Sequence, residues 1–295
     1  DHLIEESSRY ALREDYRGEK TAMMVTARSG ERRKQMVDCH DNPLSMELDE
    51  DWYPGFKMST RLSLWRANEE VINYDLVEDV LTLLLIKKDF SALAPPEGAD
   101  MSSSGSILVF LPGLGEIKAL AERLEGNRSF RSCDIIPMHS TLSSKDQRRA
   151  FIPAASGRTK IILGTNICET SITLPDVVCV IDCGRVRQVV RNKRTGGSML
   201  VQQWCAKSSC KQRAGRAGRV QPGMCLKLYS SHTAEHIMKA ESEPELRRVP
   251  LEEVCMSILA SGFSLNCQEF LNQAPQPPSS DSVLAAVEVL HQVGA

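Results

Sequence analysis

Residues 212–219, Gln-Arg-Ala-Gly-Arg-Ala-Gly-Arg, alternate long polar side chains with small ones. If this segment is helical, Gln212, Arg216 and Arg219 lie on one face at spacings of four and three. The alanines and glycines between them allow another surface to approach closely. An arginine guanidinium binds phosphate oxygens as a fork, and an arginine that completes a γ-phosphate site accelerates hydrolysis by about 10³- to 10⁵-fold. We therefore predict that these three residues are catalytic contacts to a nucleotide phosphate.

The alternative for this segment is a surface helix with scattered arginines. Each glycine in a helix interior costs about 1 kcal/mol, and small residues have no reason to recur at this spacing on a face that meets only solvent. The pattern therefore favours the phosphate site over the solvated helix.

A second polar segment, residues 164–176, reads Gly-Thr-Asn-Ile-Cys-Glu-Thr-Ser-Ile-Thr-Leu-Pro-Asp and directly follows an apolar run. Its hydroxyl and amide side chains can bind phosphate beside the backbone N–H groups of a following helix start. The residues concerned are Thr165, Asn166, Ser171 and Thr173. Thr170 and Ser171 could equally cap a helix or close a turn, and the segment alone does not decide between these interpretations.

The elements around these segments alternate between strands and helices. Short apolar runs predict strands, and apolar residues at helical spacing predict helices. The predicted strands are residues 106–111, 133–138, 160–164 and 177–182. The predicted helices are residues 73–87, 116–124 and 143–151. This alternation predicts an α/β fold with a parallel sheet that helices cover on both faces. Ligands of such sheets lie beyond the carboxyl ends of the strands, which is where residues 164–176 begin.

Three flanking regions complete the organisation. Residues 1–60 are polar, carry Asn-Pro and Pro-Gly breakers, and are interpreted as a linker with short helical pieces. Residues 188–203, with basic residues about Gly196 and Gly197, predict a projecting β-hairpin. After Pro244, apolar periodicity at residues 251–259 and 283–293 predicts a small α-helical module, which we expect to be truncated at the end of the chain.

The composition is that of an ordinary globular protein, because 42% of the 295 residues are hydrophobic. No apolar run reaches the roughly 18 residues that a membrane span needs, and the first residues lack the order of a signal peptide. We expect a cytoplasmic or nuclear location. The ten cysteines, often within apolar runs, are interpreted as reduced core thiols. Cysteine spacing and the isolated pair His232 and His236 match no four-ligand pattern, so we expect no metal site in this chain.

The net charge of the chain is only -2, but the charged residues are distributed unevenly along it. Residues 185–227 contain eleven cations and no acid. These cations are Arg185, Arg187, Arg191, Lys193, Arg194, Lys207, Lys211, Arg213, Arg216, Arg219 and Lys227. A basic stretch of this length in an otherwise acidic chain favours a partner that carries phosphates over a merely solvated face.

Three segments together resemble the motifs of DEAH/DExH-box RNA helicases of superfamily 2, in the family's order. Residues 108–117, Leu-Val-Phe-Leu-Pro-Gly-Leu-Gly-Glu-Ile, resemble motif IV, residues 165–173 resemble motif V, and residues 212–219 resemble motif VI. The resemblance implies three parts. Residues 1–60 would be an extension from a first RecA-like domain, residues 61–242 the second RecA-like (helicase C-terminal) domain, and residues 243–295 the truncated start of a winged-helix region.

The resemblance further implies that ATP is held between two RecA-like domains and that its hydrolysis drives movement along RNA. The residues expected to face the γ-phosphate are Gln212, Arg216 and Arg219. Those expected to line the nucleotide are Ser171, Thr173 and Phe151, where such helicases stack an aromatic on adenine. Phe151 could as well be a core residue at a helix end. Those expected to contact RNA are Thr165, Asn166, Arg185 and Arg187, with the hairpin helping to separate or steer strands.

The sequence also departs from the family. It contains no Gly-x-x-x-x-Gly-Lys-Ser/Thr loop and no DEAH-like acidic box, so we expect the ligands of Mg²⁺ and the residue that positions water upstream of Asp1. The chain alone should then not hydrolyse ATP. Cys168 stands where the family often has alanine, and the insert at residues 39–54 has no counterpart.

Two other interpretations stay open. A non-catalytic RNA-binding or scaffold module that kept a RecA-like fold would explain the basic stretch, but it would not need Gln212, Arg216 and Arg219 together. A DNA helicase of a related branch shares the pattern of residues 212–219, whereas the Asn-Ile-Cys-Glu-Thr-Ser wording of motif V resembles the RNA-acting branch. Because contacts to phosphate carry no sequence information, the motifs specify neither an RNA sequence nor a protein partner.

Overall fold

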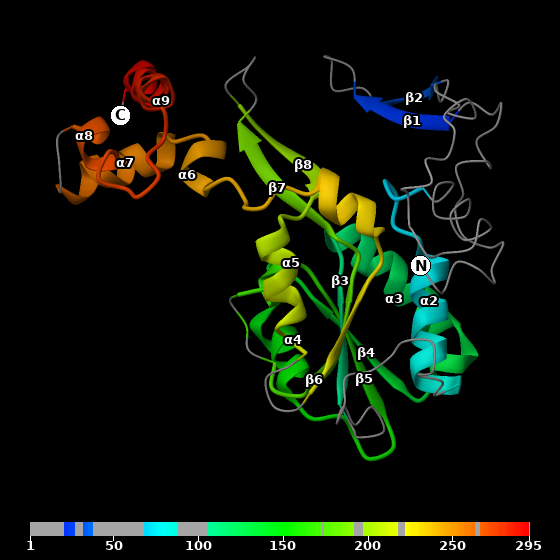
Figure 1. Ribbon diagram of the computed structural model, residues 1–295. Helices are drawn as coiled ribbons and strands as arrows, with labels where there is room; N and C mark the ends of the chain where they lie inside the picture. Colours follow the sequence, from blue (N-terminus) through cyan, green and yellow to red (C-terminus); the bar gives the residue numbers. More distant parts are fainter. Residues whose placement is uncertain are drawn as a thin grey trace.

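The computed structural model describes residues 21–26, 32–37, 68–87, 105–170, 172, 174–191, 197–217, 222–262 and 266–294. A central sheet has helices on both sides, a hairpin projects beyond one end of this sheet, and a helical module lies beside the hairpin (Figure 1). The predicted insert at residues 39–54 lies outside the described residues.

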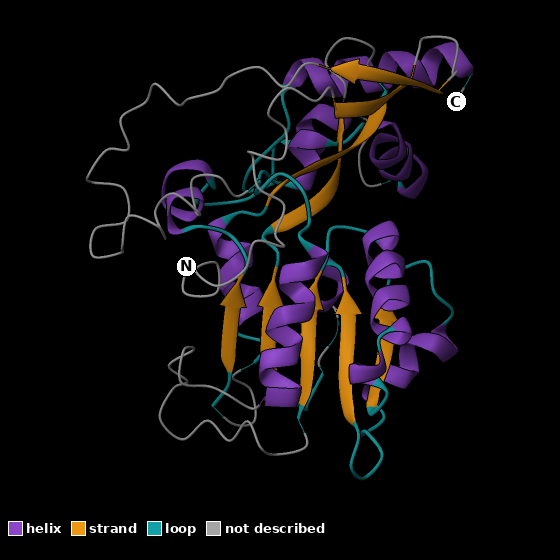
Figure 2. Cartoon of the chain, turned by 90° about the vertical axis from the view of Figure 1, so that its right-hand side faces the viewer, coloured by secondary structure: helices purple, strands orange, loops and turns teal. Residues whose placement is uncertain are grey.

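The central sheet is parallel and has the strand order β4-β5-β3-β6-β9. Its strands are β3 (Ser106–Phe110), β4 (Cys133–Met138), β5 (Thr159–Gly164), β6 (Val177–Asp182) and β9 (Met224–Lys227). The first four confirm the predicted strands. Strand β9 was missed because its four residues form too short a run to stand out in the sequence. All five strands point toward the same edge, from which the hairpin rises (Figure 2).

Helices cover both faces of this sheet. On one side lie α2 (Tyr74–Thr82), which continues into the π-helical turn Leu83–Lys87, and α3 (Leu114–Gly126). On the other side lie α4 (Ser144–Arg148), followed by the 3₁₀ turn Arg149–Phe151, and α5 (Lys207–Ala214). Local sequence sets two of the starts, because the side chains of Asn73 and Ser143 accept backbone N–H groups as N-caps of α2 and α4.

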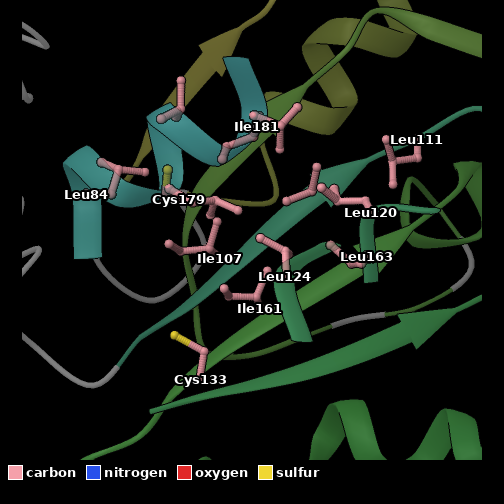
Figure 3. Close-up of a cluster of buried hydrophobic side chains, with 14 of the residues drawn as sticks. Leu84, Ile107, Leu111, Leu120, Leu124, Cys133, Ile161, Leu163, Cys179 and Ile181 are labelled. Carbon is pink, nitrogen blue, oxygen red and sulfur yellow. The ribbon is translucent and has the colours of Figure 1, made fainter. Parts of the chain in front are cut away.

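The alternating faces of the strands create two separate cores. In β3, Ile107 and Val109 belong to a cluster with Leu81 of α2 and Leu120 of α3, part of which is drawn in Figure 3. The intervening residues of β3, Leu108 and Phe110, face a second cluster that includes Ala150, Cys168 and Ala217. Side chains of a strand point alternately to opposite faces, so a strand that is buried on both sides reads as a continuous apolar run. The predicted α/β architecture is confirmed.

The hairpin is formed by β7 (Arg185–Arg191) and β8 (Ser198–Trp204), which pair antiparallel from Arg185↔Trp204 to Arg191↔Ser198. It confirms the predicted hairpin, although β7 begins three residues before the predicted start at Gln188. The C-terminal module contains α6 (Glu245–Arg248), α7 (Glu252–Ser261), α8 (Cys267–Leu271) and α9 (Ser280–Val293) around its own apolar cluster. Arg248 Nη1 donates to the carbonyl of Val189 at 2.7 Å, which ties the module to the hairpin.

The N-terminal region contains a strand pair that the sequence did not predict. Residues 1–60 were interpreted as a linker with short helical pieces, but β1 (Thr21–Thr26) and β2 (Arg32–Val37) form an antiparallel pair. Six residue pairs from Thr21↔Val37 to Thr26↔Arg32 satisfy each other's backbone groups. Pairing between strands depends on a partner outside the segment, so the weak periodicity of either strand could not reveal it.

The nine cysteines in the described ranges are free thiols, and all except the half-buried Cys225 are buried. This confirms their interpretation as core thiols. No helix in the described part of the chain is long and apolar enough to cross a membrane.

Because the Cys168 thiol is buried, we expect the free energy of unfolding to depend on pH in the alkaline range. Burial raises the pKa of the Cys168 thiol from its ordinary 9.0 to about 12, against the opposing charges of Arg216 and Arg213. Above pH 9.0 the unfolded chain loses this proton while the folded chain keeps it, so the stabilisation present below 9.0 is lost as the pH approaches about 12. We predict that Cys168→Ala weakens the fall of unfolding free energy over this range, measured by urea denaturation at several pH values.

The matched control is Leu174→Ala, which removes a buried, non-ionising side chain from the same cluster. It should lower stability while keeping the wild-type dependence on pH. An unchanged pH dependence in Cys168→Ala would contradict the prediction.

Candidate functional site

The turn after β5 brings the predicted phosphate ligands of motif V to the carboxyl edge of the sheet. Residues Asn166–Cys168 form a 3₁₀ turn, in which the Cys168 N–H donates to the Thr165 carbonyl at 3.0 Å. The turn folds back over Gly164, where a Cβ would lie only 2.6 Å from Cys168 Sγ. A larger residue at position 164 would therefore displace the buried Cys168 side chain. Thr165 is buried and Asn166 is exposed at this edge.

Arg213 of motif VI lies in the centre of the site and is fully buried. Its Nε donates to Glu169 Oε2 at 3.1 Å, and its Nη1 donates to Asp182 Oδ1 at 2.9 Å and to the Arg185 carbonyl at 3.3 Å. The guanidinium carbon lies 4.8 Å from the ring centroid of Phe110. Burial disfavours the charged guanidinium, but Asp182 and Glu169 outweigh this effect and the pKa of Arg213 is raised. The cation is retained and joins four segments.

Asp182 is equally buried, although it ends a strand that is otherwise entirely apolar. Its Oδ1 also accepts the Gly184 N–H at 2.8 Å. Gly184 has φ +68°, and a Cβ there would lie 2.5 Å from the Tyr229 ring. This glycine therefore lets the chain turn from β6 into the hairpin while Asp182 holds the turn.

Arg216 follows the end of α5 and is 6% exposed. Its Nη1 donates to the Ile172 carbonyl at 2.6 Å, and its Nη2 donates to the carbonyl of Glu169. Glu169 thus holds both arginines, Arg213 through its carboxylate and Arg216 through its backbone. The two contacts fix the turn of motif VI against the turn of motif V.

The condition that the segment from Gln212 onward is helical holds only as far as Ala214. Helix α5 ends at Ala214, and residues 215–217 form turns in which the N–H groups of Arg216 and Ala217 donate three residues back. Glycine is a poor helix former, and the contacts of Arg213 and Arg216 with motif V replace the missing helical turn. Gln212 lies exposed on α5, whereas Arg219 lies outside the described residues. Ser171 and Thr173 lie outside them as well.

The two arginines predicted at the base of the hairpin make internal contacts. Arg185 is 7% exposed, its guanidinium carbon lies 3.4 Å above the Trp204 ring, and Nη2 donates to the Glu69 carbonyl at 2.7 Å. Burial lowers the pKa of Arg185, an effect that the nearby acids Glu70 and Glu69 oppose. Arg187 is half-buried, and its Nη2 lies 2.6 Å from Glu116 Oε1 at the start of α3. Both residues brace the hairpin against the domain.

Phe151 ends the 3₁₀ turn after α4 and is 43% exposed. The core interpretation of this ring is therefore wrong, although its neighbour Ala150 is fully buried in the second cluster. Ala217, the neighbour of Arg216, belongs to the same cluster. Phe151 and Arg216 therefore flank residues that pack on one face of the sheet.

A recess opens where the motif V turn meets the base of the hairpin and the start of α5. Its lining includes Asn166, Glu169, Gln188, Ser209 and Arg213. Arg213 Nη2 is buried without a hydrogen-bond partner among the described residues. The described ranges contain no group of three or more His, Cys, Asp or Glu residues that could hold a metal ion.

Comparison with known proteins agrees with these motifs. The helicase conserved C-terminal domain matches residues 90–221. A putative DEAH-box ATP-dependent helicase from Mycosarcoma maydis is 40% identical over 225 residues, which are 76% of this chain and 14% of that protein. The ATP-dependent RNA helicase dhx29 from Xenopus laevis is 35% identical over 99% of this chain and 21% of its own length. The chain belongs to the DEAH/DExH-box helicase family.

The fold of this helicase domain has solved counterparts. The Escherichia coli DExH-box NTPase HrpB is 38% identical, with a TM-score of 0.55 over 65% of this chain and 23% of its own chain. The chain thus spans between 14% and 23% of these three proteins. The RecA-like fold class predicted from the sequence is confirmed.

In this helicase domain, motifs IV, V and VI meet at one residue that the sequence analysis did not select. Arg213 contacts Phe110 of motif IV and Glu169 of motif V, and it belongs to motif VI itself. A signal for this contact was present in the sequence, because Asp182 is an acid at the end of a wholly apolar strand. A buried acid requires a cationic partner. The contacts of Arg185 with Trp204 and of Arg187 with Glu116 had no comparable signal in the sequence.

We predict that Arg213→Met lowers the free energy of unfolding by about 3–5 kcal/mol, because it leaves the buried carboxylate of Asp182 unpaired. The matched control is Arg158→Met, which removes an ion pair with Asp134 whose side chains are 37% and 36% exposed. That loss should be about 0–1 kcal/mol. Urea denaturation measures both, and equal losses would show that the buried cluster is no more important than an exposed pair.

Proposed function

We propose that this chain is the C-terminal motor half of an ATP-dependent RNA helicase. The observation that carries the proposal is the placement of Arg216, which motif V holds by two carbonyls beside the buried Arg213 cluster. A guanidinium held in this way has a defined position from which to meet a phosphate group. Contacts of a guanidinium with a charged phosphate are stronger than those with neutral carbonyls, so a γ-phosphate can compete for Arg216.

On the nucleotide side, we propose that Arg216 and Gln212 contact the γ-phosphate, together with Arg219. Phe151 would stack on the nucleobase, and Ser171 and Thr173 would line the cleft. This assignment is supported by the packing of Ala150 and Ala217 in one cluster, because these alanines are the chain neighbours of Phe151 and Arg216. An exposed aromatic and a fixed guanidinium on one face suit a molecule with a flat base and an anionic end.

ATP therefore fits the residues that are present, whereas Mg²⁺ needs ligands from elsewhere. No group of three or more acidic, histidine or cysteine side chains in the described ranges could hold a metal ion. We propose that a first RecA-like domain supplies the phosphate loop and the acidic box that hold Mg²⁺, which neutralises charge on the phosphates. This chain would supply the arginines and would not hydrolyse ATP alone.

On the RNA side, we propose that Thr165 and Asn166 contact the phosphate backbone at the carboxyl edge of the sheet. The exposure of Asn166 supports this role. Arg191, half-buried near the outer end of β7, would add a cationic contact. Arg185 and Arg187 would act by bracing the hairpin, because their guanidiniums contact Trp204 and Glu116.

For the intact helicase that contains this chain, we predict that Arg216→Ala lowers RNA-stimulated ATP turnover by about 10³-fold or more, the range of an arginine finger. Steady-state phosphate release with and without single-stranded RNA measures the effect. The matched control is Arg128→Ala, an exposed arginine that follows α3, which should leave turnover unchanged.

A folded Arg216→Ala variant with normal turnover would identify the domain as an RNA-binding or scaffold module instead. Folding is checked by circular dichroism, so that loss of activity is not confused with loss of structure. A DNA helicase would show stimulation by single-stranded DNA and none by RNA.

We predict that RNA affinity of the intact helicase falls steeply with salt, because bound cations release counterions from the phosphates. Arg191→Gln should reduce the slope of log K against log salt by about one. Arg131→Gln, at an exposed position before the amino end of β4, should leave the slope unchanged. Fluorescence anisotropy with a labelled single-stranded RNA gives these slopes. A flat profile for the wild type would exclude the basic stretch as the contact surface.

A further inference from the structure

The aromatic ring proposed to stack on the nucleobase has little packing of its own. Phe151 is 43% exposed and the following Ile152 is 61% exposed. Phe151 is the last residue of a 3₁₀ turn of only three residues, Arg149–Phe151, and Ile152 follows this turn in an extended conformation. A short exposed turn does not hold a ring in one orientation by itself, so its position depends on contacts made by the backbone.

Those contacts come from Lys160, the second residue of β5, which is 1% exposed. Its Nζ donates to the Ala150 carbonyl at 2.8 Å and to the Ile152 carbonyl at 3.1 Å, on either side of Phe151. It also lies 2.7 Å from Asp176 Oδ2. A lysine ammonium has three donors, and all three have an acceptor here. This complete set of partners makes the buried charge tolerable.

Asp176 is itself fixed by the central strand. Its carbonyl accepts the Ser106 N–H at 2.7 Å, and its Oδ1 accepts the Ser106 hydroxyl at 3.2 Å. Ser106 begins β3, and Asp176 directly precedes β6. Lys160 therefore connects the backbone around Phe151, through Asp176, to the central strand β3 of the sheet.

We propose that Lys160 is a positioning residue that orients Phe151 for contact with the nucleobase. This inference rests on the proposed stacking role of Phe151. Without the ammonium, the two flanking carbonyls lose their anchor and the ring samples several orientations. Nucleotide binding must then select one of them, which weakens affinity without changing the groups at the γ-phosphate.

The test measures the KM for ATP of the intact, RNA-stimulated helicase in four forms. These are the wild type, Phe151→Ala, Lys160→Met and the double variant. Loss of base stacking is typically worth about 1–3 kcal/mol, or roughly 5- to 150-fold, so Phe151→Ala should raise KM by about tenfold. Lys160→Met should raise it by several-fold with kcat within about twofold of the wild type. The double variant should match Phe151→Ala alone, because Lys160 acts through that ring.

A probe without a base separates orientation of the ring from general damage. Inorganic tripolyphosphate, used as a competitive inhibitor, should keep its wild-type inhibition constant in both single variants. The matched control is Arg158→Met, since Arg158 likewise binds one carboxylate, Asp134, and two carbonyls, those of Arg131 and Cys133, away from Phe151. It should leave the KM for ATP unchanged.

Lys160→Met leaves Asp176 without its ion-pair partner, and this variant could fail to fold for that reason. A second variant covers this case. Lys160→Met with Asp176→Leu removes both charges, and such replacements are often neutral for stability. It still lacks the donors to the flanking carbonyls and should show the same rise in KM.

The outcomes separate the two proposals. A normal KM in Phe151→Ala would refute the stacking role and with it this inference. A raised KM in Phe151→Ala with a normal KM in the folded Lys160 variants would refute the positioning role alone. Additive effects in the double variant, or weaker binding of tripolyphosphate, would also overturn it.

Discussion

The buried guanidinium of Arg213 is the contact on which the arrangement of the three motifs depends. Its donors reach the carboxylates of Asp182 and Glu169, and its plane lies near Phe110. A fully buried cation is stable only when its partners keep their positions, so the cluster tolerates few alternative packings. The cluster therefore holds together three segments that are distant in the sequence. The position of the neighbouring Arg216 depends on this packing, because Arg216 donates to carbonyls of motif V.

The proposed RNA contacts lie at the carboxyl edge of the sheet, whereas the proposed nucleotide contacts lie on one of its faces. Residues that follow β5 lie at the carboxyl edge, where Asn166 is exposed. Phe151 and Arg216 are instead chain neighbours of Ala150 and Ala217, which both belong to the second core cluster on one face of the sheet. Glu169 links the two regions, because its N–H donates to the Asn166 carbonyl while its own carbonyl accepts from Arg216. A displacement of the turn that we propose to contact RNA would therefore also move the carbonyl that holds Arg216.

How much could be predicted from the sequence depends on whether the information was local. The strands β3 to β6, the helices between them and the hairpin were predicted, because apolar periodicity is a property of each segment. The pairing of β1 with β2 and the end of α5 at Ala214 were missed, because tertiary partners decide both. Arg213 was overlooked for the same reason. The residue types of motif VI favour phosphate contacts, but only the fold shows which arginine faces inward.

Charge in the sequence is an incomplete guide to charge on the surface. Of the eleven cations in residues 185–227, Arg213 and Arg185 are buried, and Arg187 is paired with Glu116 from a segment about seventy residues earlier. Cations in a run without acids can therefore be paired, after folding, with acids from other segments. The cations proposed to bind RNA have to be chosen from those that the fold leaves at least partly exposed, so burial must be known before they can be named. We therefore propose that phosphate is contacted by Arg191 near the outer end of β7 and not by the two arginines at the base of the hairpin.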